Sequence, residues 1–350
     1  MIQIDIARTM ETAGALHQAG RLDEAEGLCR QVLAVDPDHA HGLHLLGIIA
    51  HQRGHNELAV DLIGKAIARN DGVADFHSNI GIALGALGRI GEAEAHYRQA
   101  ISLDPQHAAS HNNFGHLLTD QGRLEEAQWH LRQSLELEPQ HASVHYNLGN
   151  NLKAKGRYEE AIVHYKQSIV RRPDFGDAWN NMGVAFAERG DLDAARDAYQ
   201  KAVEVDPTRA SYHRNLAHTK RFQPDDPQLA VMEGLARNLM SDLHFALGKA
   251  YADLKQHDRS FQHLLAGNAV KRAQIVYSEA ETLGYMQRIR NVFNADLLRA
   301  KNGDGDSART PVFIVGMPRS GTTLIEQIIA SHPKASGLPH SPRWRYCPSR

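Results

Sequence analysis

The sequence repeats itself at a constant interval of 34 residues over more than half of its length. Four rows of residues keep this interval. They are the glycines Gly20, Gly54, Gly88, Gly122, Gly156 and Gly190; the glycines Gly47, Gly81, Gly115, Gly149 and Gly183; the alanines Ala25, Ala59, Ala93, Ala127, Ala161 and Ala195; and the prolines Pro37, Pro105, Pro139, Pro173 and Pro207, with Asp71 in the position that lacks proline. An uninterrupted repeat of this length predicts a stack of similar units rather than one globular core.

The two glycine rows predict the first half of a helical hairpin. Gly81 lies in the middle of a helical pattern, where glycine costs about 1 kcal/mol. We therefore expect the backbone of a partner helix to approach it closely. Gly88 follows that helix and precedes the polar Arg89, which suits a left-handed C-terminal cap.

The second half of the unit is an amphipathic helix. Ala93, Tyr97 and Ala100 are spaced i, i+4, i+7 and form one apolar stripe. The helix is expected to end at Asp104, because the residue before a proline is disfavoured in the α region. Each unit is therefore a helix–turn–helix that must stack on its neighbours to bury its apolar face.

Small residues at the helix contacts, glycine at the turn and proline at the end resemble the tetratricopeptide repeat family. The resemblance implies an all-α solenoid, a right-handed superhelix, over residues 6–221. The first copy departs most, with Ala13 for glycine and Cys29, expected as a small buried hydrophobe, for an aromatic residue. Residues 228–300 resemble a degenerate copy, in which Lys255 and Ser260 replace Gly and Ala, and 301–310 are interpreted as a linker. The six full copies are expected at 6–39, 40–73, 74–107, 108–141, 142–175 and 176–209.

Composition excludes several classes of protein. The 39 Lys+Arg and 41 Asp+Glu give a formal net charge of −2, which disfavours a nucleic-acid or anionic-membrane binder. Two cysteines cannot form a disulfide framework, and no apolar run approaches the ~20 residues that span a bilayer. We expect a cytoplasmic protein without nucleic-acid or membrane partners.

One polar row marks a candidate peptide-binding surface. In the tetratricopeptide repeat family the first helices line the concave groove, and similar asparagine ladders occur in O-linked N-acetylglucosamine transferases. A primary amide carries both a donor and an acceptor, so a row of them could hold the backbone of an extended peptide. The alternative interpretation is that each amide bonds a neighbouring helix. The candidate peptide-binding residues are Asn79, Asn113, Asn147, Asn181 and Asn215.

The 22 histidines do not predict a metal site. Ten of them keep the phase of the repeat, and no Cys/His spacing matches a zinc motif. They are therefore interpreted as copied repeat positions, and no metal is expected. The three phases are His77, His111, His145 and His213; His96, His130 and His164; and His39, His107 and His141.

The repeat gives way to a different pattern at residues 311–337. Residues 311–315 are an apolar, β-branched run that predicts a buried strand, 316–323 form a glycine-bearing loop, and 324–330 read as a helix. This order aims backbone N–H groups and a helix N-terminus at a phosphate. The spacing fits a nucleotide P-loop, but Thr322 stands where that motif requires lysine.

The loop and the following His-Pro resemble the 5′-phosphosulfate loop of sulfotransferases, in particular bacterial tetratricopeptide–sulfotransferase fusions and tyrosylprotein sulfotransferases. The resemblance implies 3′-phosphoadenylyl sulfate (PAPS) as the donor, no metal, and in-line transfer of the sulfuryl group to an acceptor hydroxyl, with protein tyrosine as one candidate. It also implies that a protein or peptide occupies the repeat groove. The residues implied to hold the 5′-phosphate are Arg319, Ser320, Gly321, Thr322 and Thr323.

The resemblance covers about 25 residues, fewer than a sulfotransferase domain contains. The general-base Glu that the resemblance leads us to expect is absent: no carboxylate follows Glu326, so the catalytic residue is unknown. We expect a sequence truncated within that domain and inactive in this form, with 338–350 an irregular tail read out of frame after a frameshift near 337. The alternatives are a non-enzymatic tetratricopeptide scaffold and, less compatible with Thr322, a P-loop kinase.

Overall fold

The computed structural model describes residues 5–236, 241–274 and 278–292 of the chain, and these residues contain helices and no strands. The chain divides into two units, residues 1–275 and 276–350. None of the helices in the described ranges is both long enough and apolar enough to cross a bilayer.

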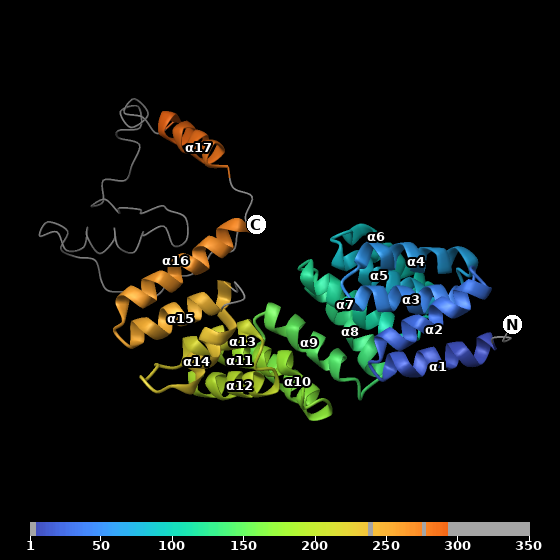
Figure 1. The fold of residues 1–350 in the computed structure, drawn as a ribbon, viewed down its shortest axis with the longest axis horizontal. Helices are drawn as coiled ribbons and strands as arrows, with labels where there is room; N and C mark the ends of the chain where they lie inside the picture. Colours follow the sequence, from blue (N-terminus) through green and yellow to red (C-terminus); the bar gives the residue numbers. More distant parts are fainter. Residues whose placement is uncertain (1–4, 237–240, 275–277, 293–350) are drawn as a thin grey trace, which may run out of the picture. The chain divides into compact units, whose positions relative to one another are not determined.

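Twelve of the helices in the described ranges form six antiparallel hairpins (Figure 1). The first helices of the hairpins are α1 (Ile6–Gln18), α3 (Ala40–Gln52), α5 (Ala74–Ala86), α7 (Ala108–Asp120), α9 (Ala142–Ala154) and α11 (Gly176–Arg189). The second helices are α2 (Leu22–Val35), α4 (Asn56–Arg69), α6 (Ile90–Leu103), α8 (Leu124–Leu137), α10 (Tyr158–Arg171) and α12 (Leu192–Val205).

The turn inside each hairpin is built on a left-handed glycine, which confirms the predicted cap. Gly88 has φ +73°, and the other five members of its row also have positive φ. The Gly88 N–H donates to the Gly85 carbonyl and the Arg89 N–H donates to the Leu84 carbonyl, both at 3.0 Å. These bonds satisfy carbonyls that the end of α5 would otherwise leave unpaired.

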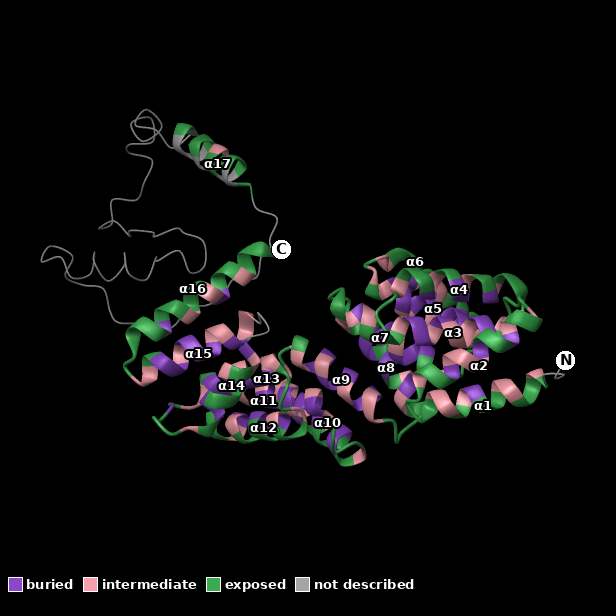
Figure 2. Cartoon of the chain, viewed as in Figure 1, coloured by how far each residue is buried: buried purple, intermediate pink, exposed green. Residues whose placement is uncertain are grey.

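The mid-helix glycines make room for a side chain of the second helix. A Cβ placed on Gly81 would lie 2.7 Å from the Tyr97 Cε1. The expected close approach is therefore made chiefly by a side chain. Backbone contributes at some repeats, as at Gly115, where an added Cβ would lie 3.1 Å from the Ala127 carbonyl oxygen. Figure 2 shows buried residues along the facing sides of the paired helices.

The predicted apolar stripe of the second helices is confirmed. Ala93 and Ala100 are completely buried and Tyr97 is 3% exposed. In the cluster that contains Ala93 and Tyr97, Leu62 and Ile63 of the preceding hairpin pack together with Phe76 of the same hairpin. The core therefore runs continuously from one hairpin into the next, as nearest-neighbour stacking requires.

The solenoid continues beyond the six hairpins with α13 (Ala210–Thr219), α14 (Pro227–Ala236), α15 (Ser241–Asp253) and α16 (His257–Ala273). Helices α15 and α16 pair as a seventh hairpin, and α13 and α14 both contact α15. Phe222, Met232 and Leu243 are buried in the cluster that joins these helices. Helix α14 follows the Pro224–Pro227 break directly, where the repeat pattern predicts no specific helix.

Lys255 occupies the left-handed position of the α15–α16 turn, with φ 59°, which is unfavourable for a residue with a Cβ. Replacing Lys255 with glycine is expected to raise the free energy of unfolding by about 0.5–1 kcal/mol, since glycine relieves that cost but gains freedom in the unfolded chain. Thermal unfolding followed by circular dichroism measures the change. Gly88→Lys is the reverse control and should destabilise; a Lys255→Gly variant less stable than the wild type would contradict the argument.

The second unit contains α17 (Glu279–Val292) in its described part. The strand, loop and helix predicted at residues 311–337, the linker at 301–310 and the irregular tail at 338–350 lie outside the described residues. The solenoid fold is thus established for the first unit, and the sulfotransferase-like segment stays a prediction from its sequence.

Candidate functional site

The first helices form the inner layer of the solenoid, and the part of this layer from α3 to α9 carries little charge. Helix α3 contacts α5, α5 contacts α7 and α7 contacts α9. Their only Asp, Glu, Lys or Arg residues are Asp75, Asp120 and Lys153. By contrast, the second helices carry ion pairs such as Arg89–Glu92 at 2.7 Å and Arg123–Glu126 at 2.5 Å. The inner layer is thus suited to ligands recognised through neutral polar and apolar contacts.

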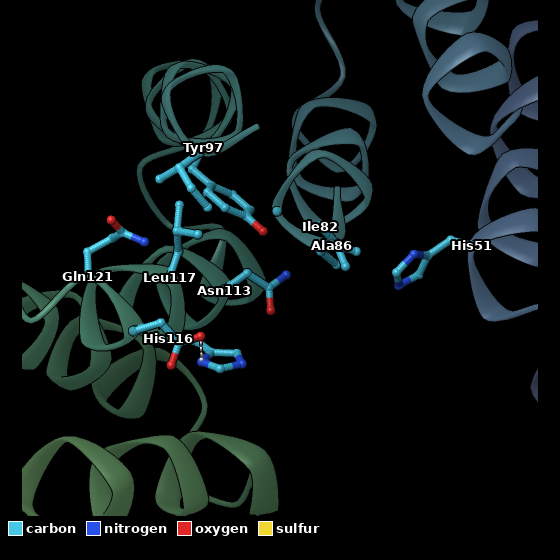
Figure 3. A pocket seen from close by; sticks show the side chains of 11 residues that line it. His51, Ile82, Ala86, Tyr97, Asn113, His116, Leu117 and Gln121 are labelled. Carbon is cyan, nitrogen blue, oxygen red and sulfur yellow. Dashed lines mark ion pairs between the residues drawn. The ribbon is translucent and has the colours of Figure 1, made fainter. Parts of the chain in front are cut away.

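A pocket of about 360 Å³ lies on this layer, between α3, α5 and α7. In Figure 3 the side chains of Asn113, His116 and Leu117 extend from α7 toward Ile82 and Ala86 of α5, while His51 of α3 lies farther along the layer. Apolar and polar groups therefore both line the pocket. Asn113 is the one member of the predicted asparagine row that lines it.

Two polar pairs border the pocket. The His116 Nδ1 lies 3.6 Å from the Asp120 carboxylate, and both side chains are more than half exposed, so the pair contributes little to stability. The His51 Nδ1 lies 2.7 Å from the Asn56 Oδ1. Both pairs leave polar atoms near the pocket without burying a charge.

The other residues of this pocket were not predicted as a site, although the sequence contains a signal for some of them. Asn113, His116, Leu117 and Asp120 follow the i, i+3, i+4, i+7 spacing that places residues on one face of a helix. Extending the asparagine row by this spacing would have indicated the part of the lining that α5 and α7 contribute, but not Ile90 and Tyr97 of α6. Ile82 follows Asn79 by the same three positions.

The asparagine row forms a ladder between adjacent repeats. The amide nitrogen of each member lies within hydrogen-bond distance of a side chain 35 residues earlier, on the first helix of the preceding repeat. The contacts join Asn79 to the His44 Nε2 (2.9 Å), Asn113 to the Ser78 Oγ (3.4 Å), Asn147 to the Asn112 Oδ1 (3.0 Å), Asn181 to the Tyr146 hydroxyl (3.0 Å) and Asn215 to the Asn180 Oδ1 (2.8 Å).

These contacts agree with the alternative interpretation that each amide bonds a neighbouring helix. Asn147 is 7% exposed, whereas the other four members of the row are half-buried. A half-buried amide can bond its neighbour through nitrogen and still offer its oxygen to a ligand. Peptide binding by the row therefore stays a prediction, and it requires the oxygens rather than the nitrogens.

Burial controls the ionisation of the inner layer. It lowers the pKa of His44 to about 4, because a buried imidazole loses the solvation of its charged form. Burial also lowers the pKa of Lys153 on α9, against an opposing attraction from Glu188. In the described ranges no three His, Cys, Asp or Glu residues converge as metal ligands do.

Stacked helical hairpins with a side-chain-lined groove define the class of repeat solenoid proteins. Within that class the chain belongs to the tetratricopeptide repeat proteins, since profiles of this repeat match residues 15–75, 74–107, 106–172 and 146–210. The profile of the sulfotransferase family matches residues 311–348. The chain therefore joins a tetratricopeptide solenoid to a sulfotransferase-family segment.

Similar proteins share the solenoid. An uncharacterised protein of Aquifex aeolicus (strain VF5) is 29% identical over 161 residues, which are 43% of this chain and 21% of that protein. The chain thus matches about a fifth of the length of this curated relative. Among solved structures, the APC/C hetero-tetramer Cut9–Hcn1 gives a TM-score of 0.59 at 19% identity, over 75% of this chain and 52% of the matched chain. The Pseudomonas aeruginosa pilF structure gives 0.50 at 20%, over 61% and 97%. These two structures support the fold alone.

Proposed function

We propose that this chain is part of a sulfotransferase in which the solenoid holds a protein acceptor and the segment after it binds PAPS. The observation that carries the proposal is the sulfotransferase-family match at residues 311–348 in a chain whose first 210 residues are tetratricopeptide repeats. The substrate and the direction of transfer rest on the motif in the sequence, since the segment lies outside the described residues.

The motif supplies the chemistry that a phosphosulfate end requires. The residues from Arg319 to Thr323 combine one guanidinium, three hydroxyls and a glycine in a loop that precedes a predicted helix. Bound PAPS would supply an activated sulfuryl group. Arg319 would bind its 5′-phosphate and offset the negative charge there, Ser320, Thr322 and Thr323 would donate hydrogen bonds to it, and Gly321 would let the backbone approach closely.

The inner layer supports an extended, weakly charged acceptor segment. The pocket between α3, α5 and α7 offers apolar surface beside Asn113 and His116. The asparagine ladder recurs on the first helices from α5 to α13, so amide oxygens recur along this part of the layer. An extended peptide could lie across several repeats and present one hydroxyl, on tyrosine or another residue, to the transfer site.

A non-enzymatic scaffold is the second candidate function. It is favoured by the pocket, whose lining among the described residues comes from the solenoid, from His51 to Gln121. The similarity to a chain of the Cut9–Hcn1 assembly is compatible with such a role. A scaffold predicts partner binding without affinity for a nucleotide.

Calorimetric titration with 3′,5′-adenosine bisphosphate separates the two functions. We expect binding by the wild type and at least a 10-fold weaker affinity after Arg319→Ala/Thr322→Ala, because a hydrogen bond to a charged group contributes about 1.5–3 kcal/mol. Asn113→Ala, in the solenoid pocket, is the matched control and should bind as the wild type does. Absence of binding by the wild type would refute a donor site in this chain, and preference for ATP with magnesium would indicate a kinase.

A further inference from the structure

Four histidine pairs join the two helices of four hairpins. In each pair the two Nδ1 atoms face one another, and the residues are 19 positions apart. The pairs are His77–His96 (3.0 Å), His111–His130 (2.9 Å), His145–His164 (3.1 Å) and His244–His263 (3.1 Å). The sequence places the first three in shared repeat phases, but their pairing is visible only in the folded chain.

Backbone carbonyls fix the tautomers of two of the four pairs, His77–His96 and His111–His130. The Nε2 atoms of His77 and His111 lie 3.1 Å and 3.2 Å from the carbonyl oxygens of Asp71 and Pro105, in the turns between repeats. Because a carbonyl only accepts, Nε2 carries the hydrogen, and in a neutral ring Nδ1 is then an acceptor. The partner, His96 or His130, therefore donates from its own Nδ1. Each such pair links the preceding turn, the first helix and the second helix.

Helix α13, which follows the six hairpins, provides a natural comparison. His213 on α13 also bonds an inter-repeat carbonyl, with its Nε2 2.8 Å from the Pro207 oxygen. Its Nδ1 faces the side-chain amide of Gln228 at 3.3 Å rather than a second imidazole. An amide can therefore take the donor role of the second histidine, and an amide does not titrate near neutral pH.

Each histidine pair can bind one additional proton in this geometry, but not two. A single added proton still leaves one N–H donor and one acceptor between the rings, because the neutral partner can change tautomer. A second proton places two N–H groups and two positive charges about 3 Å apart, which is strongly repulsive where water is largely excluded. The two helices must then separate.

The charges around His111–His130 and around His145–His164 oppose protonation more than they favour it. His107 lowers the pKa of His111, and Arg98 and Arg123 lower the pKa of His130. Glu126 raises the pKa of His130. Asp75 raises the pKa of His107 through a hydrogen bond whereas the pKa of His111 is lowered, so His107 gains its positive charge at a higher pH than His111 does. The other pairs face Glu92 (His77–His96); Arg171, Arg132 and Glu160 (His145–His164); and Glu233 and Arg259 (His244–His263).

Burial brings the pKa of His130 and of His145 to about 4. It is also the largest cause of the lowered pKa of His96, His111, His164, His244 and His263. An unfolded histidine titrates near 6.5. Below that value the unfolded chain binds more protons than the folded one, so stability is complete above pH ~6.5 and declines as the pH falls toward 4.

We propose that the paired histidines form an acid-sensitive clasp, which holds the hairpins closed while each pair shares one hydrogen and releases them when both rings are protonated. The clasp acts on α5–α6, α7–α8, α9–α10 and α15–α16. The first three of these hairpins carry part of the inner layer, so mild acid would loosen the surface on which a partner lies.

The test compares two triple variants with the wild type by circular dichroism during acid titration. The clasp variant is His96→Gln/His130→Gln/His164→Gln, which copies the His213–Gln228 arrangement. The control removes three exposed histidines, in His55→Gln/His141→Gln/His257→Gln. The clasp variant is expected to keep its helicity to a pH about one unit below the wild type, and the control to unfold at the wild-type pH.

A second measurement does not depend on the stability of any variant. Imidazole nitrogen chemical shifts of the wild type should show His111 as the Nε2–H tautomer and His130 as the Nδ1–H tautomer at neutral pH. The proposal is overturned if the clasp variant and the wild type unfold at the same pH, or if both rings carry their hydrogen on Nε2.

Discussion

Replacing Gly149 with alanine is expected to destabilise the solenoid by about 2 kcal/mol, although alanine is the better helix former by about 1 kcal/mol. An alanine Cβ would lie 2.6 Å from Cε1 and 2.8 Å from Cδ1 of Tyr165. The tyrosine cannot move away easily, since its ring is fully buried and its hydroxyl donates to the Asn150 Oδ1 at 2.8 Å. The clash must therefore push α9 and α10 apart.

Gly64→Ala is the matched control for this prediction. Gly64 is also in mid-helix, in α4, but a Cβ there meets nothing within 4 Å. The control should stabilise the protein by about 0.5–1 kcal/mol through helix propensity alone. Urea unfolding of both variants measures the two changes. If Gly149→Ala were as stable as Gly64→Ala, the close approach of Tyr165 would have no energetic role.

Truncating Leu131 to alanine is expected to cost about 3–4 kcal/mol, within the range for fully buried leucines. Leu131 has no exposed surface and packs in one cluster with Leu148 and Leu152 of the next hairpin. Its Cγ also lies 2.6 Å from where a Cβ on Gly115 would be, so it fills the space that this glycine leaves. The truncation removes contacts within one repeat and across the boundary to the next.

The result should be visible in the shape of the unfolding transition as well as in its midpoint. Repeat stability is a sum of unit and nearest-neighbour terms, so weakening one boundary uncouples the segments on either side. We expect a broader or two-step urea transition for Leu131→Ala. Leu137 is the last residue of the same helix and is 39% exposed, so Leu137→Ala should change the free energy of unfolding by less than about 1 kcal/mol. Equal effects of the two truncations would contradict a core role for Leu131.

The asparagine row illustrates how far periodicity carries an inference. A 34-residue interval places the five amides at equivalent positions on successive first helices, and this is what the structure contains. The interval does not predict which atoms are in contact. Each amide nitrogen reaches a side chain 35 residues earlier, and that contact depends on the offset between adjacent first helices, as in Asn147 to Asn112.

The histidines likewise show that a shared repeat phase does not predict which side chains are in contact. Their shared phases indicate copied positions, and no convergent metal cluster is present in the described ranges. The face-to-face Nδ1 atoms, as in His111 and His130, lie on two antiparallel helices 19 residues apart. Rotation of either helix by a fraction of a turn would separate these two atoms. The repeat interval does not determine that rotation.

By itself the sequence determined the repeat length, the hairpin unit, the glycine turns, the buried stripe of the second helices and the sulfotransferase-like motif. Each of these depends on neighbours along the chain or on a strict period, which sequence records directly. Only the tertiary structure decided that a side chain of the second helix, such as Tyr97, fills the space beside a mid-helix glycine, and that α14 forms beside α13 and α15. It also decided that histidines on the two helices of a hairpin pair with each other. These outcomes depend on the rotation and separation of packed helices, which follow from the fit of many side chains at once.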